Sequence, residues 1–315
     1  MPSSTVQSFT EPGEYAASFR AVTAELSVSA PGRFAAKLTR IDLHRLWMQR
    51  FSENLPWVKR AAAAAGRAIF AFRTEPGPAL LWNGMEMQPS TLVWCSEGYE
   101  AFQRSSGPSS WAGISLPIEQ MAAVVGATAA CDLSSPRDDR TVTPQPSAIA
   151  KLQRLHAAAG DLAEHAPEVI SHAEAARGLE NALVQAMVAC LTTRDGAEES
   201  SAARRHGTIM RRFYAEIAEH PGEAIYIPDI CAALGVPQRT LNVCCHESLG
   251  VGPKRYLLLR RMNLAKQALY VADAARTTVT QVAADFGFWS FGRFAVEYRE
   301  LFGETPSATL RRQRQ

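Results

Sequence analysis

Residues 227–253 read IPDICAALGVPQRTLNVCCHESLGVGP, and their pattern returns at residues 279–306 as VTQVAADFGFWSFGRFAVEYRELFGETP. Apolar, glycine and proline positions recur in register after 52 or 53 residues. The matched pairs are Ile230 with Val282, Cys231 with Ala283, Gly235 with Gly287, Leu241 with Phe294, Cys245 with Tyr298, Gly250 with Gly303, and Pro253 with Pro306. A repeat of this kind indicates a duplicated structural unit.

Each copy has the features of a helix-turn-helix. Gly235 stands where a left-handed residue lets the chain turn sharply, and Pro237 opens the next helix, where its missing N–H costs nothing. The spacing predicts that one face of each helix packs inward. The inward residues of the first copy are Ile230, Cys231, Leu234, Leu241 and Cys245.

The opposite face of the second helix in this copy is left to Gln238, Arg239, Asn242, Val243 and His246. An exposed polar face on a short helix suits the major groove of DNA. Residues 253–271 read as one connecting helix, which would span about 27 Å at the usual rise. Successive major-groove faces lie about 34 Å apart, so the connector could seat both reading helices on one side of a duplex.

Residues 206–311 strongly resemble the AraC/XylS family of bacterial transcription regulators. The resemblance rests on Gly250, Pro253, Tyr256, Arg260-Arg261-Met262, Ala265, Ala268-Leu269, Val282-Ala283, Phe286-Gly287-Phe288, Phe294, Tyr298, Gly303 and Pro306. It implies a double-stranded operator as partner, with RNA polymerase as a second partner. It also implies that Arg239, Asn242, Val243 and His246 face the DNA in the first copy, and Phe291, Gly292, Arg293 and Val296 in the second.

Ser290 and Arg299 complete the DNA-binding residues that we expect in the second copy. The chain departs from the family at Val243 and Val296, where basic or polar residues are common, and Gly292 has no side chain. The second reading helix can use Phe291 against a thymine methyl group and its arginines against phosphates. We therefore expect sequence discrimination to come mainly from the first copy, although a solvated helix face is the alternative for the arginines.

Length and composition limit the number of domains and the class of protein. The 315 residues suffice for about two domains, and 47% hydrophobic with 20% charged residues is ordinary for a globular protein. Residues 1–203 carry 17 Lys and Arg against 21 Asp and Glu, whereas residues 204–315 carry 16 against 10. The excess of basic residues in the last third suits a polyanionic partner.

No membrane span or secretory signal is visible, so we expect a cytoplasmic protein with no membrane partner. The six cysteines show no Cys-x-x-Cys pair and no zinc spacing, which favours reduced, mostly buried thiols. A vicinal disulfide between Cys244 and Cys245 would need distortion of a helix.

The first part of the chain alternates β-like runs with turn signals. Residues 1–18 are polar and read as a loose arm, and residues 61–65 could form a helical turn. Strands are expected at 34–41, 44–51, 67–72, 91–95, 99–104 and 110–116. This spacing predicts a cupin-like antiparallel β-barrel over residues 1–126, closed by a short helix at 117–126.

Residues 127–203 are expected to hold a polar linker at 132–147, amphipathic helices near 149–159 and 179–191, and a second linker at 192–202. These helices could pack on the barrel, which we favour, or form a homodimer interface. The fold class is thus α+β and multidomain, with a barrel, a helical middle segment and an all-α domain over 204–315.

The barrel has only His44, so no metal or other cofactor is expected. Trp47, Trp94 and Phe102 could line an effector pocket, although aromatic residues at strand spacing are more often plain core. No nucleophile elbow or phosphate loop is present, so an enzyme is not expected. Two alternatives remain open: an effector-independent activator whose first domain only dimerises or contacts partners, and a catalytic barrel joined to a DNA-targeting domain.

Overall fold

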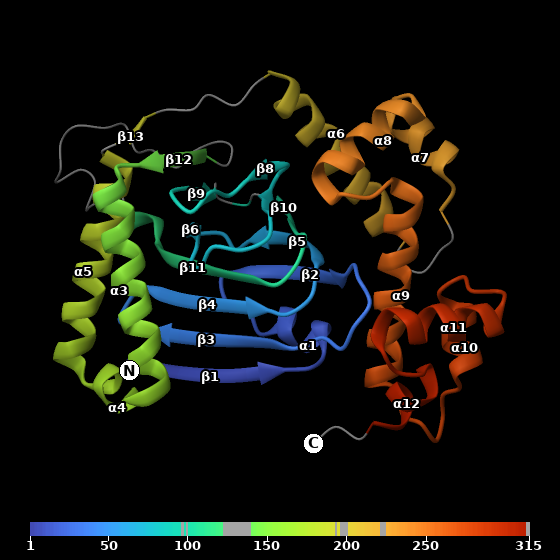
Figure 1. Ribbon diagram of the computed structural model, residues 1–315, viewed down its shortest axis with the longest axis horizontal. Helices are drawn as coiled ribbons and strands as arrows, with labels where there is room; N and C mark the ends of the chain where they lie inside the picture. Colours follow the sequence, from blue (N-terminus) through green and yellow to red (C-terminus); the bar gives the residue numbers. More distant parts are fainter. Residues whose placement is uncertain are drawn as a thin grey trace.

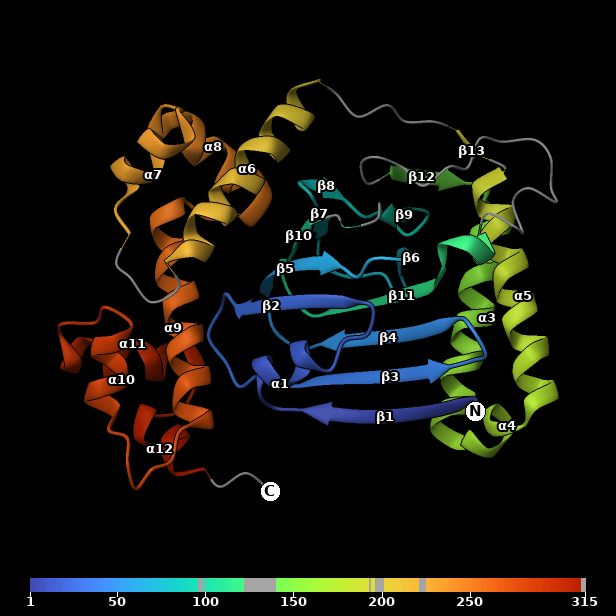
Figure 2. The same cartoon turned by 180° about the vertical axis from the view of Figure 1, so that it is seen from behind.

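A computed structural model describes residues 1–95, 98, 100–121, 140–192, 194–195, 201–220 and 225–312. A β-rich part stands between two helical parts (Figure 1). Helices α3, α4 and α5 cover one side of it, and helices α6 to α12 lie on the other. The view from behind shows the same order of layers (Figure 2).

The β-rich part consists of two antiparallel sheets. The larger has the order β1 (Ser3–Phe9), β3 (Ala36–Asp42), β4 (Trp47–Glu53), β11 (Ser109–Pro117), β6 (Arg67–Arg73), β9 (Leu92–Cys95), β12 (Arg140–Pro144), β13 (Arg194–Asp195). The smaller has the order β2 (Val22–Val28), β5 (Trp57–Ala63), β10 (Glu100–Ser105), β7 (Leu80–Trp82), β8 (Met85–Glu86). The α+β fold class and all six predicted strands are confirmed, although β4 begins three residues later than expected.

Three apolar clusters follow from the alternation of side chains along these strands. Phe51, Trp57 and Trp111 belong to the cluster between the two sheets. The far face of the larger sheet packs against α3 (Pro146–His165), α4 (Pro167–Ser171) and α5 (Ala173–Thr192) in a second cluster. The far face of the smaller sheet contributes Val58 and Phe102 to the core of the C-terminal helices.

Two predictions for the N-terminal part are wrong. Residues 1–18 are not a loose arm, because Ser3–Phe9 pairs along its whole length with β3 and Pro12–Ala17 forms helix α1. The strand is held at the sheet edge by backbone hydrogen bonds, which its mostly exposed polar side chains do not signal. Residues 61–63 end strand β5 rather than forming a helical turn, because pairing with β2 and β10 outweighs the helix propensity of alanine.

The middle of the chain also differs from expectation. Within the predicted linker at 132–147, Arg140–Pro144 is strand β12 and pairs with β9. Of the predicted closing helix at 117–126, residue Pro117 ends strand β11, residues 118–121 are helical, and residues 122–126 lie outside the described residues. The expected packing of the amphipathic helices on the β-rich part is confirmed, because Leu152, Leu183 and Met187 share a cluster with residues of the larger sheet.

The C-terminal helices are α6 (Ser201–Glu219), α7 (Ile227–Leu234), α8 (Gln238–Leu249), α9 (Pro253–Val271), α10 (Val279–Asp285), α11 (Phe291–Phe302) and α12 (Pro306–Arg311). They form one apolar cluster around α6 to α8 and another around α10 to α12, with α9 contributing to both. Among the helices of the described ranges, none has an apolar stretch long enough to cross a lipid bilayer.

Candidate nucleic-acid interface

The first helix-turn-helix consists of α7 and α8. Gly235 ends α7 in the left-handed conformation, with φ of 66°, and its N–H donates to the carbonyl oxygen of Ala232. Ile230, Leu241 and Cys245 are fully buried, as the sequence predicts. This packing orients α8 so that its opposite face is free of the domain core.

The residues predicted to contact DNA from α8 lie on that outer face. Gln238, Arg239, Val243 and His246 are exposed, and Asn242 is half-buried. The Asn242 Oδ1 and His246 Nε2 atoms lie 3.6 and 3.4 Å from where a Cβ on Gly252 would stand. Because they sit four residues apart, these two side chains occupy adjacent positions beside the start of α9.

The second helix-turn-helix consists of α10 and α11. The Thr278 side chain caps α10 by accepting a hydrogen bond from the Gln281 N–H at 3.2 Å. The inward residues Val282, Ala283, Phe294 and Tyr298 are buried, which is again the predicted pattern.

All residues predicted to contact DNA from the second copy are exposed: Ser290, Phe291, Gly292, Arg293, Val296 and Arg299. The Arg293 Nε donates to the Glu297 carboxylate at 2.7 Å, and this hydrogen bond raises the pKa of the guanidinium. A phosphate would therefore compete with the half-buried Glu297 carboxylate for this arginine.

Three further exposed residues escaped the sequence reasoning. Trp289 precedes α11 and is 80% exposed, although a tryptophan in a turn normally packs. Lys254 and Arg255 stand exposed in the first turn of α9. The sequence did hold a signal for Lys254 and Arg255 as functional residues, because the first turn of a helix usually carries acidic rather than basic residues.

Helix α9 sets the relation between the two copies. Its 19 residues match the predicted connector end to end and give a length of about 28 Å. Tyr256 packs into the cluster of the first copy, and Leu259, Met262 and Leu269 pack into that of the second. The two units stand toward opposite ends of this helix (Figure 1).

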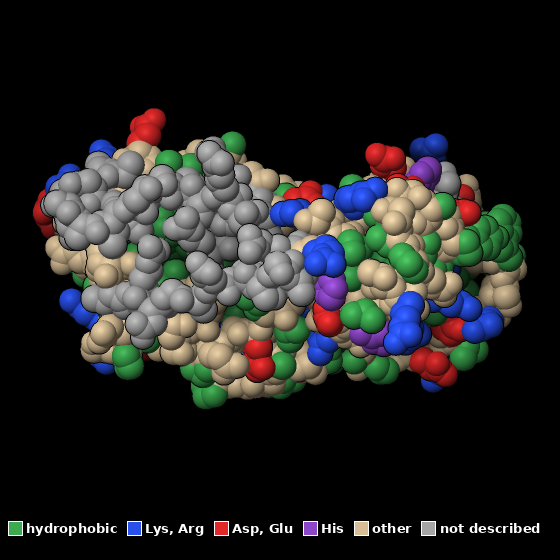
Figure 3. Space-filling view, turned by 90° about the horizontal axis from the view of Figure 1, so that it is seen from above, with side chains coloured by type: hydrophobic (Ala, Val, Ile, Leu, Met, Phe, Trp, Pro, Cys, Tyr) green, Lys and Arg blue, Asp and Glu red, His purple; other side chains and the backbone are tan. Residues whose placement is uncertain are grey.

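The surface around the first copy is mixed in charge. Seen from above, Lys, Arg and His side chains over the C-terminal helices alternate with apolar and acidic ones (Figure 3). On the face seen in Figure 3, positive charge is therefore scattered rather than gathered in one continuous patch.

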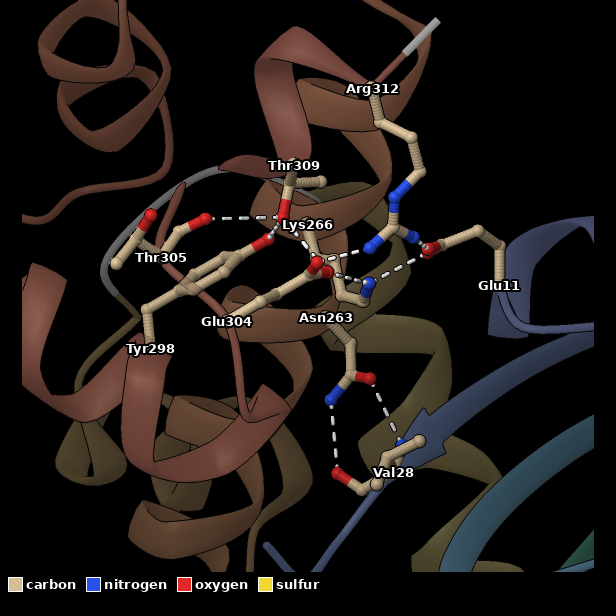
Figure 4. Close-up of polar contacts among 9 residues, drawn as sticks. All are labelled: Glu11, Val28, Asn263, Lys266, Tyr298, Glu304, Thr305, Thr309 and Arg312. Carbon is tan, nitrogen blue, oxygen red and sulfur yellow. Dashed lines mark hydrogen bonds and ion pairs between the residues drawn. The ribbon is translucent and has the colours of Figure 1, made fainter. Parts of the chain in front are cut away.

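The two helix-turn-helix units belong to a domain that is docked on the β-rich part. The Asn263 side chain on α9 accepts a hydrogen bond from the Val28 N–H at 3.0 Å and donates to the Val28 carbonyl oxygen at 3.1 Å (Figure 4). The Arg260 guanidinium pairs with the Glu25 carboxylate of β2 at 2.7 Å. The Tyr214 ring on α6 stacks on Phe102 of β10, with centroids 4.2 Å apart.

A second docking contact is a four-residue charge cluster, which we call the clamp: Glu11, Lys266, Glu304 and Arg312. The Lys266 Nζ lies 2.7 Å from Glu11 Oε2 and 2.9 Å from Glu304 Oε1, and Arg312 contacts both carboxylates (Figure 4). Burial acts to raise the pKa of Glu304, but the Lys266 hydrogen bond and the nearby positive charges lower it in sum. The clamp ties the segment before α1 to the second helix-turn-helix.

The three aromatic residues predicted to line an effector pocket do not come together. Trp94 packs on Phe70 on the face of the larger sheet that is covered by helices, and Phe102 stacks outward on Tyr214. Trp47 lies against the Arg67 guanidinium, 3.6 Å from ring centroid to Cζ. The prediction of a shared pocket fails because strand alternation sends Trp94 and Phe102 away from the space between the sheets.

The space between the sheets does contain a cavity, of about 40 Å³. Its lining residues include Gln49, Phe51, Lys59, Trp82 and Trp111. Within the described ranges, no group of three or more His, Cys, Asp or Glu side chains is arranged to hold a metal ion.

Comparisons with known proteins agree on the C-terminal part. Residues 230–312 match the family model described as a helix-turn-helix domain. The chain is 37% identical over 103 residues to a probable thc operon regulatory protein of Rhodococcus erythropolis, covering 33% of this chain and 31% of that one. It is 40% identical over 76 residues to a XylDLEGF operon transcriptional activator of Pseudomonas putida, covering 24% and 23%.

These matches span about a third or less of the relatives' own length. Among solved structures, the AraC-like transcriptional activator CuxR aligns over 84% of this chain and 95% of its own, with 14% identity and a TM-score of 0.42.

Proposed function

Since the carboxy-terminal third of this chain belongs to the AraC/XylS family of helix-turn-helix regulators, we propose that the whole protein is a sequence-specific transcription regulator. In this proposal α8 and α11 enter adjacent major grooves on one face of a promoter duplex. The observation that carries the proposal is the exposure of both outer helix faces on two units that share one 19-residue helix.

The two reading helices would make different contributions to DNA recognition. Asn242 and His246 are neighbours on α8 and can donate to and accept from base edges. On α11 the corresponding surface offers Phe291, Gly292 and Val296, which have no side-chain hydrogen-bonding groups. Base discrimination is therefore assigned mainly to α8, while Arg293 and Arg299 hold phosphates.

The test compares two substitutions over a salt series on operator and unrelated DNA. Asn242→Ala should weaken specific binding by about 1–3 kcal/mol and relax the base preference. Arg293→Ala should weaken binding to every sequence and flatten the dependence on salt. Arg177→Ala removes an exposed arginine of α5 and serves as the control. Equal losses for both test variants on every sequence would contradict the assignment.

We further propose that the N-terminal part controls this activity through a small-molecule effector. The cavity between the sheets supports this, and so do the contacts from β2, β10 and the clamp, which link that part to both reading units. A bound effector should raise the melting temperature by mass action, in a screen of metabolites against the full chain. RNA polymerase and a second copy of the chain are the other partners that we propose.

A further inference from the structure

A lysine lies in the middle of the apolar space between the two sheets. Lys59 lies on strand β5, between β2 and β10, and only 1% of its surface is exposed. Its Nζ stands 3.8 Å from the ring centroid of Trp111, 4.8 Å from Trp57 and 5.2 Å from Phe19. Burial of an ammonium group among rings is costly unless it is compensated, so this position calls for an explanation.

The rings compensate only part of that cost. Cation–π contacts offset part of the lost hydration, but an ammonium group also has three N–H donors to satisfy. Within the described ranges, no oxygen or nitrogen atom accepts a hydrogen bond from Lys59 Nζ, and no carboxylate lies within 4.0 Å of it.

The nearby carboxylate is engaged elsewhere. Glu53 accepts hydrogen bonds from the Tyr15 hydroxyl at 2.7 Å, the Ser109 hydroxyl at 2.7 Å and the Trp111 indole N–H at 3.1 Å. These three donors engage both oxygen atoms of the Glu53 carboxylate. Burial raises the pKa of Glu53, and burial also lowers the pKa of Lys59 to about 7, although the charge of Glu53 partly offsets the second effect.

The lysine borders the cavity. The walls beside it are apolar, with Ala71, Trp82 and Ala101 among them. The volume of about 40 Å³ exceeds what one water molecule occupies by roughly threefold, so the site has room for a small organic group.

One side of the cavity is bordered by a strained segment between α1 and β2. Ala21 lines it with φ of 63°, a left-handed conformation that is unusual for a residue with a side chain. The Gln49 side chain holds this segment by accepting from the Arg20 N–H at 2.8 Å and donating to the Arg20 carbonyl oxygen at 2.9 Å. Strain of this kind persists where the surroundings impose it, and it is common beside ligand sites.

We propose that this cavity binds a small monocarboxylate with a compact apolar body, whose carboxylate accepts hydrogen bonds from Lys59. The carboxylate supplies the acceptors that the ammonium lacks, and the apolar body packs against Ala71, Trp82 and Ala101. This rests on the proposed function, because it names the chemical class of the effector.

The site is also placed to influence DNA binding. Tyr15, which donates to Glu53, lies on α1, and Glu11 of the clamp directly precedes the same helix. A ligand that rearranges the Lys59–Glu53 surroundings can therefore change the docking of the second helix-turn-helix through one short helix.

The experiment measures ligand binding by the full chain without DNA, so its failure leaves the DNA-binding proposal standing. Acetate and isobutyrate are compared with acetamide and isobutyramide, which match them in size but are neutral. Melting temperature and calorimetry are followed up to about 10 mM ligand. At least one carboxylate should bind at least tenfold more tightly than its amide.

Lys59→Met should remove this preference for the charged ligand, whereas Lys151→Met, which changes an exposed lysine of α3, should preserve it. Ala71→Leu fills the cavity and leaves Lys59 in place, so it should abolish binding of both members of a pair. The Ala71→Leu variant also tests the proposed site if the Lys59→Met variant does not fold. Equal binding of carboxylate and amide, an unchanged preference in Lys59→Met, binding retained in Ala71→Leu, or no binding at all would each overturn the proposal.

Discussion

The clamp makes a quantitative prediction about domain docking. Glu11→Gln keeps the size of a side chain that is 4% exposed and removes its charge. Lys266 retains Glu304 at 2.9 Å, so its ammonium is not left unpaired. The loss is therefore that of charge-assisted hydrogen bonds to Glu11, about 2 kcal/mol, rather than the about 3–5 kcal/mol of a fully broken buried pair.

Amide hydrogen exchange at Val28 measures this loss of docking free energy, because the Val28 N–H donates to Asn263 Oδ1 across the same interface. Weaker docking by about 2 kcal/mol should speed exchange at Val28 about thirtyfold. Amides of the β3–β4 ladder should not change. Glu14→Gln, on exposed surface one turn along α1, is the matched control and should leave Val28 within about twofold of wild type.

An unchanged rate at Val28 in Glu11→Gln would refute the reasoning, since the clamp would then not hold the interface closed. So would equal acceleration by Glu14→Gln, which would point to a general loosening of α1.

Two further predictions concern stability. Burial lowers the pKa of His156 to about 4, so the unfolded state binds the extra proton between that value and about 6.5. Stability is lost as the pH falls through this range, by about 3 kcal/mol in urea unfolding, and His156→Asn should flatten the dependence while His165→Asn should not. Gly235→Ala should lower the free energy of unfolding by about 1 kcal/mol, because φ is 66° at this position. The added Cβ itself would meet no other atom within 4 Å, so the backbone conformation is the sole source of the loss. Gly250→Ala should cost at least as much, because φ is 71° there and the Arg104 guanidinium must also move away from the new Cβ, and a smaller cost than that of Gly235→Ala in thermal unfolding would contradict this account.

Local sequence patterns were sufficient to predict the helices and turns of the C-terminal part. The turn glycines Gly235 and Gly287 adopt the left-handed conformation, and α9 begins and ends at the predicted residues. Inward and outward faces were also predicted correctly. These features depend on residues within about four positions of one another, which a repeat of apolar, glycine and proline positions reports directly.

The β-rich part was less predictable. Six strands were visible as apolar runs, but β1 and β5 were not, because backbone pairing with neighbours holds them. The sheet face to which Trp94 and Phe102 point could not be known without the strand register, since a shift of one residue in the pairing moves each side chain to the opposite face of the sheet.

The sequence by itself therefore determined the two helix-turn-helix units, their spacing and the residues on their outer faces. Only the tertiary structure decided that Lys59 borders a cavity with no hydrogen-bond acceptor for its ammonium among the described residues, and that Glu11 meets Lys266 from 255 residues away. Helix-turn-helix units are specified by short-range sterics and periodicity. Contacts between distant segments depend on how whole layers pack, and no local pattern encodes that.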